Sequence, residues 1–217
     1  ACDAMGINAI EVIRAGKFEY PRTDVAMPGL VGGPCLEKDP HILIASLAHT
    51  GTALEITAAC RHVNERQPGE TAATILDRIG EVSAAPFRIA VAGIAFKGRP
   101  ETDDLRGSMS IRVIDSLLAD PRVGEIAVYD PIVSDGDLSS LGRGLMIADT
   151  VEGACDGAHA LLICNNHPEF GGLDLDACCD AMAPGGFVYD YWAHLVERSP
   201  LELSGRYLAL GNNMGRF

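Results

Sequence analysis

From residue 87 onward, short apolar runs alternate with helical segments, and this alternation most constrains the fold. The predicted strands cover residues 88–93, 125–129, 160–164, 186–190 and 207–210. The predicted helices between them cover residues 108–118, 151–155 and 173–182, and Ser108 is placed to cap the first of these. Such alternation predicts a parallel sheet with helices on both faces. Ligands of such sheets bind beyond the C-terminal ends of the strands.

The first part of the chain lacks this alternation and is predicted to be helical around one loop. The predicted helices cover residues 1–15, 39–48, 52–66 and 70–82. Asp39 is predicted to cap the second helix, with Pro40 at its first helical position. Pro68 and Gly69 are predicted to end the third. The fold class is therefore α/β, with a helical region at residues 1–85 and a parallel-sheet domain at residues 86–217.

Charge and composition exclude several classes of function. The chain of 217 residues has 30 acidic and 17 basic side chains, a net charge of −13, and 47% hydrophobic residues. An acidic protein is a poor binder of nucleic-acid phosphates and of anionic membranes. No apolar run approaches the ~20 residues of a membrane span, and no signal peptide is evident. A soluble, cytoplasmic protein is expected, with no nucleic-acid or membrane partner.

The cysteines argue against disulfides and metal sites. The chain has seven cysteines, an odd number, and no C-x-x-C pair. A disulfide framework or a zinc site is therefore not expected. The cysteines are expected to be reduced thiols. The six histidines show no spacing typical of metal ligands. No metal is predicted.

The densest chemical motif is the segment 28–40, which reads PGLVGGPCLEKDP. Its glycines let a ligand approach the backbone closely. Cys35 comes shortly before a predicted helix start, where backbone N–H dipoles and Lys38 would favour a thiolate. Asp39 could orient a water or assist proton transfer. The alternative interpretation is a tight turn with a buried structural cysteine, in which Asp39 only caps a helix.

A second candidate segment, residues 96–108, follows the first predicted strand. Lys97 and Arg106 are cations suited to a phosphate or carboxylate. The alternative interpretation is a solvated charged loop without a ligand. The strand ends in GIAFKG, which is neither the G-x-G-x-x-G fingerprint of dinucleotide-binding domains nor a P-loop. Trp192, the only tryptophan, follows the strand at residues 186–190 and is expected to serve in packing.

Four segments together resemble the UDP-glucose/GDP-mannose dehydrogenase family of nucleotide-sugar 6-dehydrogenases. Segment 28–40 resembles the family's P-G-x-G-x-G-G-x-C-x-x-K-D signature, and segment 89–108 resembles G-x-A-F-K-x-(N)-T-D-D-x-R-x-S. Segment 59–68 (ACRHVNERQP) is similar to A-R-x-I-N-x-x-x-P, and 128–131 (VYDP) matches V-Y-D-P. The V-G-G-P-C and D-P features look most like the branch acting on UDP-N-acetylmannosamine.

The resemblance implies a domain organisation. Family members have an N-terminal NAD-binding Rossmann domain, a central helical dimerisation domain and a C-terminal Rossmann-like nucleotide-sugar domain. Residues 1–85 would be the central dimerisation region with the cysteine loop, and residues 86–217 the nucleotide-sugar-binding domain. The chain is thus expected to be a C-terminal fragment, inactive alone, that forms a homodimer through the helix at residues 52–66.

The resemblance also implies an activity. The C6 alcohol of a UDP-sugar would be oxidised to a carboxylate by two successive NAD⁺, in a pathway to envelope polysaccharide. Cys35 would form a thiohemiacetal and then a thioester, while Asp39 acts with an upstream lysine on water. Lys38 and Arg106 would lie near the cofactor. The implied substrate contacts are Arg22, Ala26, Pro28, Gly29, Leu30, Gly32, Phe96 and Lys97.

The chain departs from the family pattern at several positions. The segment between Phe96 and Arg106 is two residues longer than the usual F-K-x-N-T-D-D-x-R. Leu30 stands where glycine is common, and Glu37 where proline is common. Residues 190–192 (DYW) replace the D-x-R of many members, which predicts loss of a substrate-contacting arginine and a different sugar. The competing hypotheses are a non-catalytic nucleotide-sugar-binding or dimerisation protein and a cysteine-dependent hydrolase that pairs Cys35 with a histidine.

Overall fold

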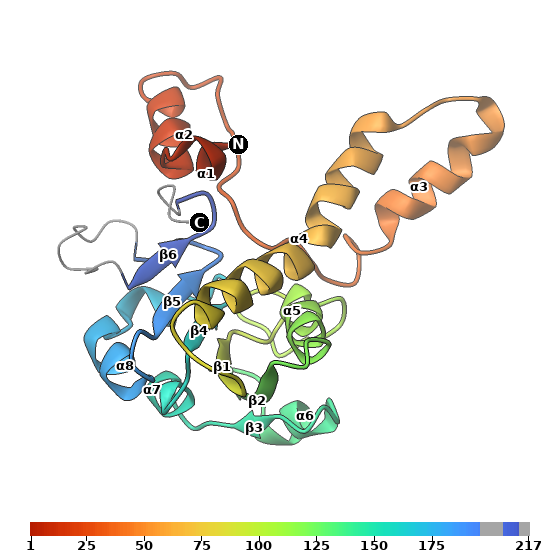
Figure 1. Ribbon diagram of the computed structural model, residues 1–217. Helices are drawn as coiled ribbons and strands as arrows, with labels where there is room; N and C mark the ends of the chain where they lie inside the picture. Colours follow the sequence, from red (N-terminus) through yellow and green to blue (C-terminus); the bar gives the residue numbers. More distant parts are fainter. Residues whose placement is uncertain (196–205, 213–217) are drawn as a thin grey trace.

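A six-stranded parallel sheet forms the core of the computed structural model, which describes residues 1–195 and 206–212 (Figure 1). Its strands are β1 (Phe87–Ala92), β2 (Val123–Tyr129), β3 (Met146–Ile147), β4 (Ala160–Ile163), β5 (Phe187–Asp190) and β6 (Tyr207–Ala209). The spatial order is β3-β2-β1-β4-β5-β6, and all five pairings are parallel. The predicted parallel sheet is confirmed. The short edge strand β3 was not predicted.

Helices cover both faces of the sheet. The connecting helices are α5 (Met109–Leu118), α6 (Asp135–Ser140), α7 (Val151–Cys155), the 3-10 helix η2 (Pro168–Gly172) and α8 (Leu175–Ala181). Alternate residues of β1 serve two separate cores: Ile89 and Val91 pack with α5 and its neighbours, while Ala90 and Ala92 pack with α7 and α8. Successive side chains of a strand point to opposite faces of the sheet. A strand buried on both faces therefore appears in the sequence as a continuous apolar run.

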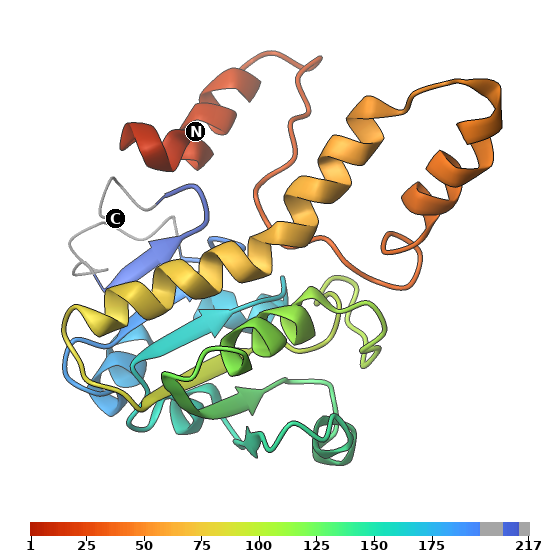
Figure 2. The same cartoon turned by 45° about the vertical axis from the view of Figure 1, so that its right-hand side comes forward.

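The N-terminal part of the chain consists of helices and connecting loops. The helices are α1 (Cys2–Met5), α2 (Ala9–Lys17), α3 (Asp39–Leu47), the 3-10 helix η1 (Ala48–Thr50) and α4 (Glu55–Gly80). Figures 1 and 2 show α3 and the first half of α4 projecting as an arm, with α1 and α2 above the strand ends. No helix in the described part of the chain is both long and apolar enough to cross a membrane.

The structure has one helix, α4, where the sequence predicted two helices separated at Pro68 and Gly69. It runs unbroken for 26 residues with Pro68 inside it. An internal proline removes one backbone hydrogen bond and costs ~3 kcal/mol or more. The second half of α4 nevertheless buries Ile75, Leu76 and Ile79 in the sheet's core. This packing outweighs the local cost, so the chain continues as a helix.

The helix caps also differ in part from the prediction. The N-cap residue of α3 is Lys38 rather than Asp39, and no side chain caps that helix. Asp39 lies in the first turn, where its carboxylate accepts a 2.5 Å hydrogen bond from Lys38 Nζ. Ser108 does occupy the N-cap position of α5, but its hydroxyl donates to the carbonyl of Ile94 at 2.7 Å instead of capping the helix.

Candidate functional site

The glycine-rich loop that carries Cys35 packs directly against the loop that follows β1. The backbone N–H of Gly33 donates to the carbonyl of Gly107 at 2.9 Å. A Cβ atom on Gly32 would lie 2.4 Å from that same carbonyl oxygen. Only glycine permits so close a backbone approach. The two motifs recognised separately in the sequence therefore form one site at the C-terminal edge of the sheet.

Phe96 fixes the position of this loop at Gly33. Gly33 has a φ of 103°, and a Cβ atom there would lie 2.6 Å from the Phe96 ring. Lys97 Nζ lies 5.0 Å from the centroid of the same ring. Phe96 therefore lies beside the Cys35 loop, with Lys97 next to its ring.

Helix α4 holds the loop from the other side through a residue not singled out from the sequence. The Asn64 side chain accepts from the Val31 N–H at 3.1 Å and donates to the Val31 carbonyl at 2.7 Å. The neighbouring Leu30 is 3% exposed and belongs to the core. Asn64 falls in the segment that resembles the family's A-R-x-I-N pattern, so a signal was present, although its partner could not be inferred.

Cys35 is exposed, which contradicts the alternative of a buried structural thiol. Its carbonyl accepts from the N–H groups of Lys38 and Asp39, at 3.1 and 2.9 Å, which turns the chain into α3. The hydrogen bond and charge of Asp39 raise the pKa of Lys38, with a smaller contribution from Cys35. The sulfur therefore lies within electrostatic reach of this ammonium group.

Carboxylates neutralise most of the cations around the loop. Arg106 donates to Asp104 at 2.7 Å, which lowers the pKa of Asp104 to about 2. The same pairing raises the pKa of Arg106, again with a minor contribution from Cys35. Lys38 is paired with Asp39. Lys97 differs, since it has no ion-pair partner among the described residues.

The first turn of the sheet, after β1, is closed to a dinucleotide. The Asp130 carboxylate accepts from the backbone N–H groups of Ile94 at 2.6 Å and Ala95 at 2.9 Å. Its other oxygen accepts from Ile132 and Val133, both at 2.9 Å. In dinucleotide-binding domains the N–H groups of this turn face the pyrophosphate. Here a buried protein carboxylate occupies them, so the pyrophosphate of NAD does not fit this turn.

The extra residues between Phe96 and Arg106 are anchored to the loop after β4. The Asn166 side chain accepts from the N–H groups of Gly98 at 2.7 Å and Arg99 at 3.1 Å. Glu101 Oε1 lies 3.2 Å from His167 Nε2, within ion-pair distance but not aligned for a hydrogen bond. These contacts bring the loop after β1 and the loop after β4 together.

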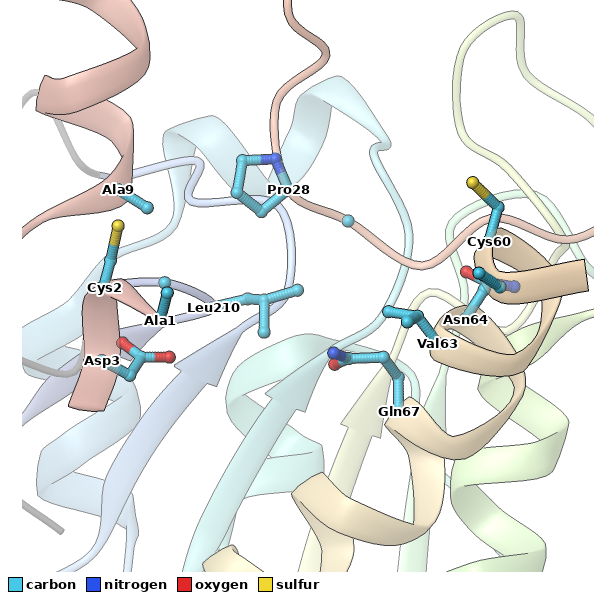
Figure 3. Close-up of a pocket in the computed structure, with 13 residues that line it drawn as sticks. Ala1, Cys2, Asp3, Ala9, Pro28, Cys60, Val63, Asn64, Gln67 and Leu210 are labelled. Carbon is cyan, nitrogen blue, oxygen red and sulfur yellow. The ribbon is translucent and has the colours of Figure 1, made fainter. Parts of the chain in front are cut away.

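The other predicted substrate residues divide into two groups. Arg22 and Ala26 are exposed on the segment between α2 and the loop, outside the contacts described above. Pro28 and Gly29 line a groove of about 630 Å³, together with residues of α1, α2 and α4 and of the chain just after β6 (Figure 3). Sequence reasoning missed the other walls of this groove, which include Cys60, Val63, Gln67 and Leu210.

Comparison with known proteins supports the resemblance seen in the sequence. Residues 1–66 match the central domain of the UDP-glucose/GDP-mannose dehydrogenase family, and residues 90–197 match its UDP binding domain. The UDP-N-acetyl-D-mannosamine dehydrogenase of Pyrococcus horikoshii is 31% identical over 180 residues, which cover 82% of this chain and 38% of that protein. The UDP-glucose 6-dehydrogenase of Gallus gallus is 29% identical over 209 residues, covering 87% of this chain and 40% of that protein.

A solved structure of the same family also matches this chain. The UDP-D-ManNAc dehydrogenase from Pyrococcus horikoshii superposes with a TM-score of 0.77 at 27% identity, covering 98% of this chain and 46% of that one. The chain thus spans less than half the length of the relatives it matches.

Proposed function

Because this chain belongs to the UDP-glucose/GDP-mannose dehydrogenase family, we propose that it supplies the nucleotide-sugar site and the cysteine nucleophile of an NAD-dependent UDP-sugar 6-dehydrogenase. One observation carries the proposal: the exposed Cys35 loop packs against the Phe96–Lys97 turn at the sheet edge where ligands of parallel sheets bind. Relatives named UDP-N-acetyl-D-mannosamine dehydrogenase favour a UDP-N-acetylhexosamine as substrate.

In this proposal the substrate lies along the glycine-rich loop. Lys97, which has no ion-pair partner among the described residues, binds the diphosphate. Pro28, Gly29, Leu30 and Gly32 present backbone to the ligand. Phe96 supports the loop through Gly33. The remaining proposed contacts are Arg22 and Ala26.

Cys35 carries the covalent step. Its thiolate adds to the C6 aldehyde, forming the C–S bond of a thiohemiacetal while the carbonyl electron pair moves to oxygen. Loss of hydride from that adduct leaves a thioester. A water oriented by Asp39 hydrolyses the thioester to the carboxylate and releases the thiol.

The dinucleotide, when bound, would supply the hydride acceptor for both oxidations, one NAD⁺ for alcohol to aldehyde and a second for thiohemiacetal to thioester. It does not fit the first turn of this sheet, where Asp130 occupies the backbone N–H groups. We therefore assign its main binding surface to a domain outside this chain. From this chain, Lys38 and Arg106 are the exposed cations beside Cys35 that would meet it.

We also propose that a second copy of the chain covers the projecting arm. Helix α3 buries none of its residues. Ile42 is 57% exposed, Leu43 46%, and Ile56 on α4 82%. Large apolar side chains exposed on two neighbouring helices favour an interaction surface here. Sedimentation at micromolar concentration should show a dimer, and a monomer would contradict this assignment. In this scheme residues 1–85 form the dimerisation region and 86–217 the nucleotide-sugar domain.

Calorimetric titration with UDP, GDP, UDP-glucose and UDP-N-acetylmannosamine tests the binding site. Lys97→Ala should weaken the uridine nucleotides by about tenfold or more, because a charge-assisted bond to phosphate is lost. Lys17→Ala is the control, since Lys17 is the last residue of α2 and pairs with Asp24 rather than with any of the proposed ligand contacts. Equal affinities for wild type and Lys97→Ala would contradict the assignment.

A second experiment separates the enzyme from the alternative of a non-catalytic binding protein. In the complete protein, Cys35→Ser should retain nucleotide-sugar binding and lose acid formation. Full acid formation by Cys35→Ser would refute the covalent mechanism. Binding without any NAD⁺ reduction by the complete wild-type protein would favour the non-catalytic alternative.

A further inference from the structure

We propose that Trp192 contacts the hexosyl group of the ligand and so helps to determine which sugar is accepted; this rests on the proposed function. Trp192 follows β5 by two residues, at the same C-terminal edge as Phe96 and Lys97. A Cβ atom on Gly29 would lie 2.8 Å from the six-membered ring of its indole. The Trp192 side chain therefore contacts the loop that carries Cys35, while its backbone continues directly from strand β5 of the sheet.

Two hydrogen bonds hold Trp192 in one orientation. Its indole Nε1 donates to the Cys164 carbonyl at 3.0 Å, and its backbone N–H donates to Asp190 Oδ1 at 2.8 Å. Asp190 is fully buried and is itself fixed by the Tyr207 hydroxyl at 2.7 Å. The ring is thus preorganised and does not have to be ordered when a ligand binds.

Residue Trp192 is nevertheless only half-buried. Aromatic walls with a few placed polar groups are typical of small-molecule sites. An indole offers no charge to a phosphate, but its faces pack well against the C–H face of a pyranose or the methyl of an acetamido group. The diphosphate has a suitable partner in Lys97, which leaves Trp192 for the uncharged part of the ligand.

The proximity of Trp192 to the Cys35 loop assigns it to the sugar rather than to the base. In the proposed reaction C6 of the hexose must reach Cys35, so the sugar lies along the loop. Trp192 meets that loop at Gly29, six positions before Cys35. An aromatic surface there selects a ligand by its apolar face instead of by its charge.

The chain supplies its own probe, because Trp192 is the only tryptophan of its 217 residues. UDP-N-acetylmannosamine should change the emission of Trp192 and protect it from acrylamide quenching, whereas UDP alone should do so weakly. This measurement requires no variant, so loss of folding cannot confuse it. Calorimetry then compares Trp192→Ala and Trp192→Phe, with Phe18→Ala, an exposed aromatic on the first segment after α2, as control.

Trp192→Ala should weaken UDP-N-acetylmannosamine by about tenfold and UDP by less than about twofold, whereas Trp192→Phe should stay within about threefold of wild type. Equal losses for UDP and the UDP-sugar, or no change in emission when the sugar nucleotide binds, would overturn the inference and leave the proposed function intact. Failure of every uridine nucleotide to bind the wild-type chain would instead contradict the proposed function, and the inference with it.

Discussion

Replacing Gly33 with alanine should destabilise the loop that carries Cys35 by about 3 kcal/mol. Two costs add at this position. The backbone has a φ of 103°, where an L side chain costs about 1–2 kcal/mol. The new methyl group would also lie 2.6 Å from the Phe96 ring. Displacing a packed ring costs about 1–3 kcal/mol, as other overpacked sites do.

Gly51→Ala provides the matched control. Gly51 also has a positive φ, 73°, but a Cβ atom there would meet nothing within 4 Å. It should therefore show only the backbone cost, partly offset by the smaller entropy of the unfolded chain, a net of about 1 kcal/mol. The difference between the two variants, about 2 kcal/mol, measures the contact between the Cys35 loop and Phe96.

Urea unfolding gives the global free energies, and hydrogen exchange at the Gly33 N–H reports on the loop itself. Introducing Gly33→Ala into a Phe96→Ala background should remove most of the difference, because the ring is then absent. Equal costs for Gly33→Ala and Gly51→Ala would refute the packing of the two loops. So would a cost of Gly33→Ala that is the same with and without the Phe96 ring.

Other parts of the molecule give further tests. Asp130→Ala should lower the free energy of unfolding by about 3 kcal/mol, because four backbone N–H groups lose their acceptor. Asp130→Asn should lower it less. Equal urea midpoints for the wild type and the two variants would contradict this prediction. Arg106 lowers the pKa of Asp104 from 3.8 to about 2, so the pair's contribution is complete above pH 3.8 and is lost as pH falls toward 2. Asp104→Asn should therefore lose less stability than wild type over that interval, whereas parallel acid-unfolding curves would show that the pair contributes nothing. Gly16→Ala should stabilise α2 by about 1 kcal/mol, because its methyl group would meet nothing within 4 Å; slower hydrogen exchange in α2 is the expected result, and unchanged exchange would count against it.

The sheet could be predicted because its information is local. Each buried strand is a short apolar run, and the helices between them have their own periodicity. Helix α4 could not be predicted as one element, because Pro68 is a strong local signal for a break. The helix is continuous since Ile75 and Leu76 pack on the sheet, a fact of tertiary structure. The strand β3 has only two residues and exists through its pairing with β2.

The candidate site was predictable in its motifs but not in its contacts. Cys35 and Lys97 were found because their residue types and neighbours form recognisable patterns. That Asn64 binds Val31, or that Trp192 touches Gly29, depends on which segments meet in space. Asp39 was expected to cap α3, yet it pairs with Lys38, because two adjacent opposite charges satisfy each other locally.

Ligand protection of thiols tests most directly the central claim that Cys35 lies in the nucleotide-sugar site. Cys35 and Cys60 are both exposed, and Cys60 lines the groove beside α4. Alkylation of each, followed by mass spectrometry with and without saturating UDP-N-acetylmannosamine, gives two rates in one experiment. The structure predicts that the ligand slows alkylation of Cys35 more than alkylation of Cys60, which shares its groove with the proposed ligand contacts Pro28 and Gly29. Protection of Cys60 with no protection of Cys35 would place the ligand in the groove instead and contradict the account.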